Sequence, residues 1–416
     1  MSFKTAKLID VTTKIGSGAT PRGGKEAYHQ SGVPLIRSQN VLDFQFSYEG
    51  LVYIDEKQAY GLRNVAVEEN DVLLNITGDS VTRCCMPDKK AVPARVNQHV
   101  AIIRANPSLA DPKYIMYSLL NPVTKKYLLS VASHGGTRNA LTKAMIENLE
   151  LSFPKLSVQQ KIASILSALD DKIELNNRMN KVLEQMAQAI FKQWFVDFEF
   201  PNENGEPYKS SGGEMEWCEE LGKEIPRGWR VGTLAEIAEI LMGQSPSSEY
   251  YNSSGDGLPF HQGVANYGYR FPVHNVFCSQ LLRVAKKGSI LMSVRAPVGR
   301  LNIADREIVI GRGLCALNPK KGNHYSYLYA LLQSVFAVED QYGSGTIFNA
   351  VSKKELESIK ILIPTSELMR SFDEVASSYD LKISNNCKAI SALTQIRDTL
   401  LPKLMSGEID VSEIEL

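Results

Sequence analysis

The sequence predicts an α+β protein in which two similar mixed α/β domains are separated by two long helices, packed as an antiparallel coiled coil with a pseudo-twofold internal repeat. Two observations predict this class. The second half of the 416 residues repeats the first at a distance of about 210 residues, and each half ends in a long heptad pattern. Because repeats of about 20–50 residues indicate solenoids, so long a period indicates duplicated domains.

Three segments of the two halves correspond in order. In the first and second half they are 70–74 and 287–291, 134–142 and 343–352, and 149–154 and 359–364. The first pair is followed by Arg83 and Arg300 at an offset of about 217, and the offset becomes about 210 from Asn139 and Asn349 onward. The preserved order predicts one shared scaffold whose loops have diverged.

The first heptad pattern follows Pro154, where Ser157 and Gln160 are expected to form a capping box. Its seam residues are Ile162, Leu166, Leu169, Ile173, Asn176, Asn180, Leu183, Ala187, Ile190 and Trp194. A shift of about 210 gives a second seam at Phe372, Ala376, Tyr379, Ile383, Asn386, Ile390, Leu393, Arg397, Leu400 and Leu404. This spacing predicts a coiled coil, formed most simply by the two helices with each other in antiparallel order.

One polar residue recurs near the middle of both seams, at Asn176 and Asn386. A buried polar group at a seam position costs stability but fixes the register and the number of partners. We therefore expect these two asparagines to set the register. The alternative, that they tolerate a wet stretch of helix, fits the sequence equally well.

These patterns divide the chain into six segments. They are a first domain at 1–155, a first long helix at 156–196, a linker at 197–228, a second domain at 229–365, a second long helix at 366–403 and a C-terminal tail at 404–416. The linker is rich in Gly, Pro and Glu, which favours an exposed turn between the first helix and the second domain.

Composition bounds the class of protein. No apolar run approaches the roughly 18 residues of a membrane span, and residues 1–4 are not followed by a signal-peptide core, so we expect a cytoplasmic protein with no membrane partner. The six cysteines lack zinc-site spacing and are expected to be free thiols. Net charge is zero, but residues 1–155 carry 19 Lys and Arg against 14 Asp and Glu, and residues 231–365 carry 13 against 10. Both domains could therefore attract phosphates.

Two motifs resemble nucleotide-binding sites but lack residues or a helix that such sites need. The segment 18–25 lacks a glycine at Ala19 and has Glu26 where a phosphate loop needs Ser or Thr. The segment 308–316 imitates a dinucleotide motif, but Asn318-Pro319 follows at once and leaves no helix to face a pyrophosphate. No coupled Ser/His/Asp or metal cluster is evident, so the sequence predicts no catalytic residues, metal site or cofactor site.

Short polar runs recur at predicted loops and strand ends, as in proteins that contact base edges and phosphates. The candidate DNA-binding residues of the first half are Arg37, Gln39, Asn40, Thr77, Arg83, Asn97, Gln98, His134, Gly135, Gly136, Thr137, Arg138 and Asn139. Those of the second half are His261, Gln262, Arg295, Arg300, Arg312, Gly343, Ser344, Gly345, Thr346 and Asn349. For any single residue, the alternative is a turn, a cap or a surface hydrogen bond.

Two segments after the helices carry a resemblance to a known family. They are Phe-Lys-Gln-Trp-Phe-Val-Asp-Phe at 191–198 and Leu-Leu-Pro-Lys-Leu-Met-Ser-Gly-Glu-Ile at 400–409. Together with Pro154, Gln159-Gln160 and the glycine-rich segment before Asn139, they make the whole chain similar to the specificity (S) subunit of type I restriction-modification systems. The second half departs from the pattern at 368–370, where Leu-Met-Arg replaces Val-Gln-Gln and weakens the predicted cap.

The resemblance implies a non-catalytic subunit that reads a split sequence in double-stranded DNA, one part per target-recognition domain. The helices would set the spacer, since a seam of about 33 residues spans roughly 50 Å against about 34 Å for one turn of B-DNA. It further implies two methyltransferase (M) subunits that use S-adenosylmethionine, and restriction (R) subunits that use ATP and Mg. A self-contained methyltransferase or nuclease, and a scaffold that never touches DNA, are the alternatives.

The resemblance also suggests where the M subunits dock. The candidates are apolar residues after the helices, expected to be exposed: Phe191, Trp194, Phe195, Phe198, Leu401 and Leu404. The alternative is that these side chains only close the ends of the coil.

Overall fold

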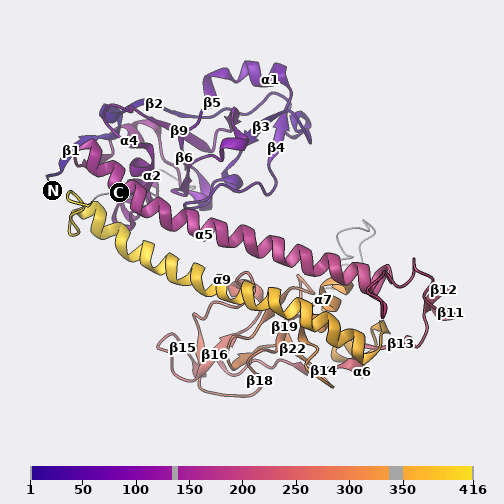
Figure 1. Cartoon of the computed structure of the whole chain (residues 1–416). Coiled ribbons are helices and arrows are strands. Elements are labelled where there is room, and N and C mark those ends of the chain that lie inside the picture. The colour runs from indigo at the N-terminus through magenta and orange to yellow at the C-terminus, as the bar shows by residue number, and fades with distance from the viewer. Residues whose placement is uncertain (1, 134–138, 337–349, 415–416) are drawn as a thin grey trace. The chain divides into compact units, whose positions relative to one another are not determined.

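The computed structural model describes residues 2–133, 139–336 and 350–414 (Figure 1). The chain divides into two compact units, the first made of residues 1–174 and 391–416 and the second of residues 175–390. Each unit therefore holds one α/β domain and a stretch of both long helices. None of the helices in the described ranges is long and apolar enough to cross a membrane.

The first unit is built on two four-stranded sheets. One has the order β2 (Thr12–Ser17), β9 (Val100–Ala105), β6 (Val72–Asn75) and β7 (Cys84–Cys85), and the other has the order β4 (Val52–Ile54), β3 (Val33–Ile36), β8 (Ala94–Val96) and β5 (Ala66–Val67). Neighbouring strands are antiparallel except for the parallel pair β3 and β8. The helices are α1 (Glu56–Gly61), α2 (Pro112–Leu120), α3 (Pro122–Ser133) and α4 (Lys143–Glu147), and β1 (Lys4–Lys7) pairs with β10 (Glu150–Phe153).

Residues 72–74 of β6 form a continuous apolar run because both faces of this strand are buried. Val72 and Leu74 point into one hydrophobic core, which α2 also contributes to, whereas Leu73 points into a second core that it shares with β8. Successive residues of a strand face opposite sides of its sheet. A strand with a core on both faces therefore needs apolar residues at every position.

The second unit repeats this topology. One sheet has the order β14 (Ala238–Met242), β22 (Leu314–Pro319), β19 (Ile290–Ser293) and β20 (Leu301–Ile303). The other has β15 (Tyr251–Asn252), β17 (Phe277–Cys278), β16 (Leu258–His261), β21 (Ile308–Ile310) and β18 (Val284–Ala285), and β16 and β21 are again the parallel pair. The remaining elements are α6 (Leu234–Ile237), α7 (Tyr325–Phe336) and α8 (Lys353–Glu357), with β13 (Arg230–Thr233) paired to β23 (Lys360–Ile363).

The strand pairing corrects the expected alignment of the halves by one residue. Val72 pairs with Ile103 in the first unit, and Ile290 pairs with Leu317 in the second, so Val72 corresponds to Ile290 rather than to Ser289. The offset is therefore 218 at this strand and falls to 217 at Arg83 and Arg300, because the intervening loop is one residue shorter in the second unit.

The long helices are α5 (Leu156–Phe191), which continues as a π-helical turn at Lys192–Val196, and α9 (Ser366–Ser406). Helix α9 runs through Pro402 and ends three residues beyond the expected 403. All twenty predicted seam residues are buried or half-buried. Within the second unit, Asn180 contacts Asn386 and Phe191 contacts Phe372, so the two helical stretches run in opposite directions there.

The expected capping box at Ser157 and Gln160 is wrong. Helix α5 already begins at Leu156, and it is Gln159 that organises its first turn. The buried Gln159 donates from Nε2 to the carbonyls of Pro154 at 2.9 Å and Leu109 at 3.2 Å, and its Oε1 accepts from the amide of Asp111 at 3.0 Å. The side chain thereby ties the start of α5 to the start of α2.

The partner of Asn386 is Asn180 and not Asn176, while the predicted register role of Asn176 and Asn386 stays a prediction. Asn386 Nδ2 donates to Asn180 Oδ1 at 2.8 Å, and both side chains are buried. A shift of about 210 residues gives the equivalent position in the other half. Two antiparallel helices instead bring residues at non-equivalent positions into contact. The equivalent of Asn180 is Ile390, whose side chain has no hydrogen-bond acceptor, and the buried Asn176 Nδ2 has no hydrogen-bond partner among the described residues.

The linker at 197–228 is only partly exposed, in contrast to the expectation. It contains a hairpin of β11 (Met215–Cys218) and β12 (Lys223–Pro226), and its apolar residues Phe198, Phe200 and Ile225 are buried in a core of the second unit. Its other residues are mostly exposed, including the polar stretches around Gly205 and Gly212 and residues 219–224. The composition of the linker predicted the exposed turn but not the buried aromatic residues beside it.

Candidate nucleic-acid interface

Four loops of the first unit meet at one end of the sheets. Thr77, after β6, is hydrogen-bonded to His99 Nδ1 at 2.6 Å, and Gln98 Nε2 lies 3.1 Å from His99 Nε2. Thr20, after β2, donates a hydrogen bond to Gln98 Oε1. Thr77 also forms a β-bridge with Ala140, so the residues after the glycine-rich segment join the same cluster.

The second unit assembles the corresponding loops. Ser245, after β14, donates to Gln262 Oε1 at 2.7 Å and accepts from the amide of Arg312 at 3.2 Å. Arg295, after β19, forms a β-bridge with Ala350, as Thr77 does with Ala140. The same four connections thus meet in both units, but different side chains occupy them.

All the exposed candidates in the described ranges except Gln39 fall on these loops. They are Arg83, Gln98 and Asn139 in the first unit and Gln262, Arg295, Arg300 and Arg312 in the second, with Thr77 half-buried. The glycine-rich candidates lie outside the described residues: His134, Gly135, Gly136, Thr137, Arg138, Gly343, Ser344, Gly345, Thr346 and Asn349. Polar, exposed and partly basic side chains on clustered loops suit contact with phosphates and base edges.

A comparison with protein families decides what these paired domains belong to. The model of the type I restriction modification DNA specificity domain matches residues 2–185 and 226–370, which together are well over half of the chain. The chain belongs to this family. It is a type I specificity subunit, a non-catalytic subunit that functions in DNA target recognition. The expected alternative of a self-contained methyltransferase or nuclease is therefore set aside.

Similar proteins include the putative type I restriction enzyme MjaX specificity subunit of Methanocaldococcus jannaschii, 27% identical over 98% of this chain and 94% of that one. The type I restriction enzyme HindI specificity subunit of Haemophilus influenzae is 26% identical, over 91% of this chain and 94% of that one. Among solved structures, the type I restriction-modification S subunit from M. genitalium has a TM-score of 0.59 at 19% identity and covers 97% of this chain and 96% of that one. The likeness to that structure confirms the fold of a specificity subunit.

Three candidate readers of this specificity subunit are buried, and the expectation that they face DNA is wrong. Asn40 is fully buried, donating to the carbonyls of Ser47 at 3.0 Å and Glu49 at 3.1 Å. Asn97 Oδ1 accepts from the amide of His99 at 3.1 Å. These amides complete the hydrogen bonding of the loop backbone, which explains why the sequence places them at strand ends.

His261 is the third buried candidate. Its Nε2 lies 3.0 Å from His274 Nδ1, and His274 Nε2 lies 2.8 Å from Asp305. Burial, with a smaller contribution from His274, lowers the pKa of His261 to about 4, so the ring is neutral at neutral pH. The buried His261 ring packs beside the loop at Gln262, and no edge of the ring is exposed to contact a base.

Arg37 and Gln39 hold a neighbouring turn in the specificity subunit. Arg37 Nη2 donates to the carbonyl of Gly50 at 2.5 Å, and Gln39 Nε2 donates to the carbonyls of Glu49 and Gly50. The alternative stated for each single residue, a surface hydrogen bond, therefore describes both side chains in this structure.

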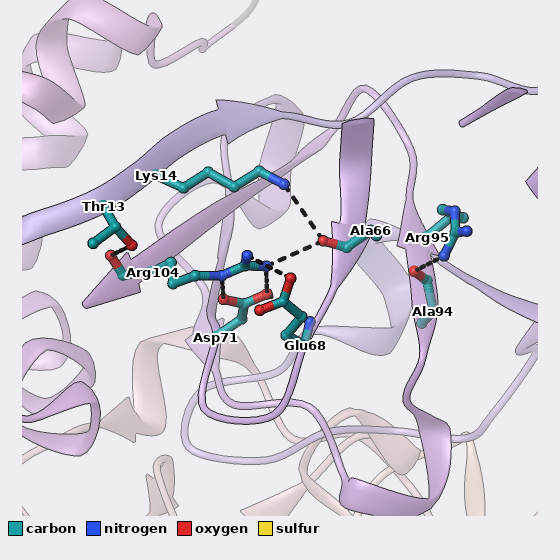
Figure 2. Close-up of polar contacts among 8 residues, drawn as sticks. All are labelled: Thr13, Lys14, Ala66, Glu68, Asp71, Ala94, Arg95 and Arg104. Carbon is teal, nitrogen blue, oxygen red and sulfur yellow. Dashed lines mark hydrogen bonds and ion pairs between the residues drawn. The ribbon is translucent and has the colours of Figure 1, made fainter. Parts of the chain in front are cut away.

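Arg104 shows that part of the basic excess of the first domain is already neutralised (Figure 2). Its guanidinium donates to both oxygens of the buried Asp71, at 2.7 and 2.9 Å, and to Glu68 at 2.6 Å. The hydrogen bond with Asp71 raises the pKa of Arg104, whereas burial lowers that of Lys14 beside it. The equivalent pair in the second unit is uncharged, with Ser289 donating to Asn318 at 2.9 Å. This cation is structural and is not available to DNA.

The glycine that opens the first failed nucleotide motif, Gly18, has a structural explanation, and so has its counterpart in the second unit, Gly243. A Cβ on Gly18 would lie 2.1 Å from the carbonyl oxygen of Val96, and one on Gly243 would lie 2.1 Å from that of Gly311. Both glycines occupy the same place in the repeat, where the loop after β2 or β14 crosses the loop before β9 or β22. They are needed for this close approach of two backbones, not for a phosphate. Thr20, His99 and Ser245 lie at these crossings, and no signal in the sequence identified Thr20 and Ser245 as members of the cluster.

The six candidate docking residues are not exposed. Phe191, Trp194, Phe195 and Phe198 pack in an aromatic core of the second unit, and Leu401 and Leu404 pack in the core of the first. None is more than 9% exposed. The expectation of exposure is therefore wrong, and the stated alternative, that these side chains close the ends of the helices, describes their contacts.

Proposed function

We propose that this specificity subunit reads a bipartite target in double-stranded DNA, with one part read by each target-recognition domain, at 1–155 and 229–365. The observation that supports this is the repeated loop cluster. The two clusters share their backbone connections, but Thr77 and Gln98 stand in the first where Arg295 and Arg312 stand in the second. A common frame with different side chains suits two readers of different sequences.

The spacer between the two parts is, in this proposal, set by the helices. Helix α5 has 36 residues, which at a rise of about 1.5 Å give roughly 54 Å, more than the roughly 34 Å of one DNA turn. The buried seam residues and the Asn180–Asn386 hydrogen bond support an antiparallel coiled coil with a pseudo-twofold repeat. Such a rod would fix the distance between the readers.

We further propose that two M subunits dock on the helical part and supply the S-adenosylmethionine site, and that R subunits supply the ATP and Mg sites in the cytoplasm. Leu175, Val182 and Met186 support a docking face on α5. They are 51%, 52% and 43% exposed and lie seven and four residues apart, which places them on one side of the helix. Exposed apolar residues in such a row are typical of an interaction surface.

The bipartite reading has a direct test. We expect the complex with its M subunits to protect two short DNA segments separated by a fixed unprotected gap, with the same two half-sequences in the methylome of a host that expresses it. Replacing Arg300 should weaken protection of one segment and leave the other intact, because each domain reads one part. A single continuous footprint, or equal loss at both segments, would contradict the two-reader model.

The spacer role predicts the outcome of a matched deletion. Removing residues 177–183 from α5 and 383–389 from α9 takes out one heptad of each helix and both members of the Asn180–Asn386 pair together. The rod then shortens by about 10 Å, and the methylated sequence should lose about three base pairs of its gap at roughly 3.4 Å per pair. The length-preserving control, with both asparagines changed to Leu, should keep the gap. An unchanged gap in the deletion variant would show that the helices do not set it.

A further inference from the structure

Each unit presents an exposed arginine at the same point of its backbone. The carbonyl of Arg83 accepts from the amide of Asn75 at 2.8 Å, at the end of β6. The carbonyl of Arg300 accepts from the amide of Ser293 at 2.9 Å, at the end of β19. The two arginines therefore leave equivalent loops from equivalent positions.

The residue before each arginine has nearly the same backbone conformation in both units. Thr82 has φ 74° and Gly299 has φ 82°, and their amides donate to Asn75 at 2.8 Å and Ser293 at 3.0 Å. Left-handed backbone suits glycine but strains a β-branched residue by about 1–3 kcal/mol. The fully buried Thr82 also has a hydroxyl without a hydrogen-bond partner in the described part of the chain. The turn before Arg83 thus retains the geometry of the turn before Arg300 despite an unfavourable residue.

The rest of these loops differs between the units. The bridging residue is Thr77 in the first and Arg295 in the second, and the second loop is one residue shorter. A side chain that reads bases is expected to change when the sequence read changes. One that contacts phosphate carries no sequence information directly and can stay the same.

The charges of both arginines are available. Within residues 2–133, 139–336 and 350–414, neither guanidinium of Arg83 or Arg300 has a hydrogen bond or an ion pair, and both side chains are exposed. Arg104 and Arg270, in contrast, are each bound to two carboxylates of their own unit. Guanidinium groups bind phosphate oxygens well, by one or two parallel hydrogen bonds.

We propose that Arg83 and Arg300 are the common phosphate anchors of the two recognition domains, each making one sequence-independent contact, while the loops beside them read bases. The assignment rests on the proposed function and deepens it, because it separates the positioning contacts from the specific ones.

The test measures affinity of the complex with its M subunits for a duplex carrying its own target, at 50 and 200 mM salt. Arg83→Ala and Arg300→Ala should each reduce the slope of log affinity against log salt by about 1, and the double variant by about 2. The advantage of the wild type over each single variant should then shrink about 3.5-fold between the two salt concentrations. Preference for the correct base at every position should be unchanged. Arg83→Lys should keep the slope, because an ammonium group also binds phosphate.

Arg63→Ala, an exposed arginine outside the loop cluster, is the matched control and should keep the wild-type slope. A wild-type slope in Arg83→Ala or Arg300→Ala would overturn the anchor assignment. Relaxed preference at one base pair with an unchanged slope would also overturn it, in favour of base reading. If the unsubstituted complex shows no salt-dependent, two-part protection of DNA, the proposed function itself fails and the anchors fail with it.

Discussion

Phe195→Ala is expected to lower the free energy of unfolding of the second unit by about 3–5 kcal/mol, the usual cost of removing a buried phenylalanine ring. The ring centroid of Phe195 lies 4.9 Å from that of Tyr327, 5.4 Å from that of Phe372 and 5.0 Å from that of Phe191. Truncation therefore opens a cavity at a point where the π-helical turn after α5, the helix α7 and the start of α9 meet. Aromatic pairs at such distances add to the area that they bury.

The next residue along the chain offers the control. Val196 is 46% exposed, so Val196→Ala should change the stability of this unit by no more than about 0.5 kcal/mol. Both variants are compared by denaturant unfolding followed by tryptophan fluorescence, since Trp194 and Trp229 lie in the same aromatic core. Wild-type stability of Phe195→Ala together with lost binding of M subunits would contradict the burial and return this residue to a docking surface.

The aromatic residues after α5 illustrate a limit of prediction from sequence. A run such as 191–198 is apolar whether it faces a partner or its own core, and nothing within the run distinguishes the two. The residues that cover it, Tyr327 and Phe372, come from segments more than 130 positions away. Only the fold brings these segments together, so the sequence supported a docking surface and a closed core equally.

The helices were more predictable than their contacts. Spacing of four and three residues identifies a buried seam because helix geometry repeats locally, and all predicted seam positions are buried or half-buried. Pairing between helices depends instead on where they cross, so Asn386 meets Asn180 and not its equivalent, Asn176. The same reasoning explains Gln159, whose partners at Leu109 and Asp111 belong to a distant loop.

The candidate readers divide according to the chemistry of their side chains. An amide is both donor and acceptor, so Asn40 and Asn97 could equally complete a loop backbone or face a base, and in this structure they complete the backbone. The repeat was a better guide than residue type. Residues placed at matching connections in both halves, such as Arg83 and Arg300, are exposed on the loops, and the glycine-rich stretches precede bridging residues of the same clusters.

Arg270→Met is expected to destabilise the second unit by about 3 kcal/mol, because it leaves two carboxylates together without their cation. Arg270 is 3% exposed and lies between β16 and β17, in the domain rather than in a long helix. It donates to Asp380 of α9 at 3.0 Å and lies 3.4 Å from Glu184 of α5. Its guanidinium also lies 4.3 Å from the centroid of the Tyr329 ring. The estimate is taken at the lower end of the range because the side chains of Glu184 and Asp380 are 20% and 32% exposed.

A double-mutant cycle separates the ion pair from simple packing. Asp380→Asn keeps an oxygen that can accept from Ser326, which now donates to Asp380 at 2.7 Å, but it removes the negative charge. If the uncompensated carboxylates cause the loss, Arg270→Met combined with Asp380→Asn should cost less than the sum of the single changes, by about 1 kcal/mol or more. Strict additivity would show that the charge of Asp380 does not contribute and that Arg270 stabilises the unit through its other contacts, with Glu184 and Tyr329.

We expect the destabilisation by Arg270→Met to stay within the second unit, because the first unit has its own ion pair at the corresponding position. Asp170 of α5 is the 210-residue equivalent of Asp380, and it too binds an arginine, since Arg397 Nη1 donates to it at 2.8 Å. Arg397 lies on α9, whereas Arg270 lies in the domain. The first domain contributes Phe44, whose ring centroid lies 3.6 Å from the Arg397 guanidinium. The same acidic position therefore receives its cation from a helix in one unit and from the domain in the other. Arg270→Met should release the second domain from its helices and leave the unfolding of the first unit unchanged, and Arg397→Met should do the reverse.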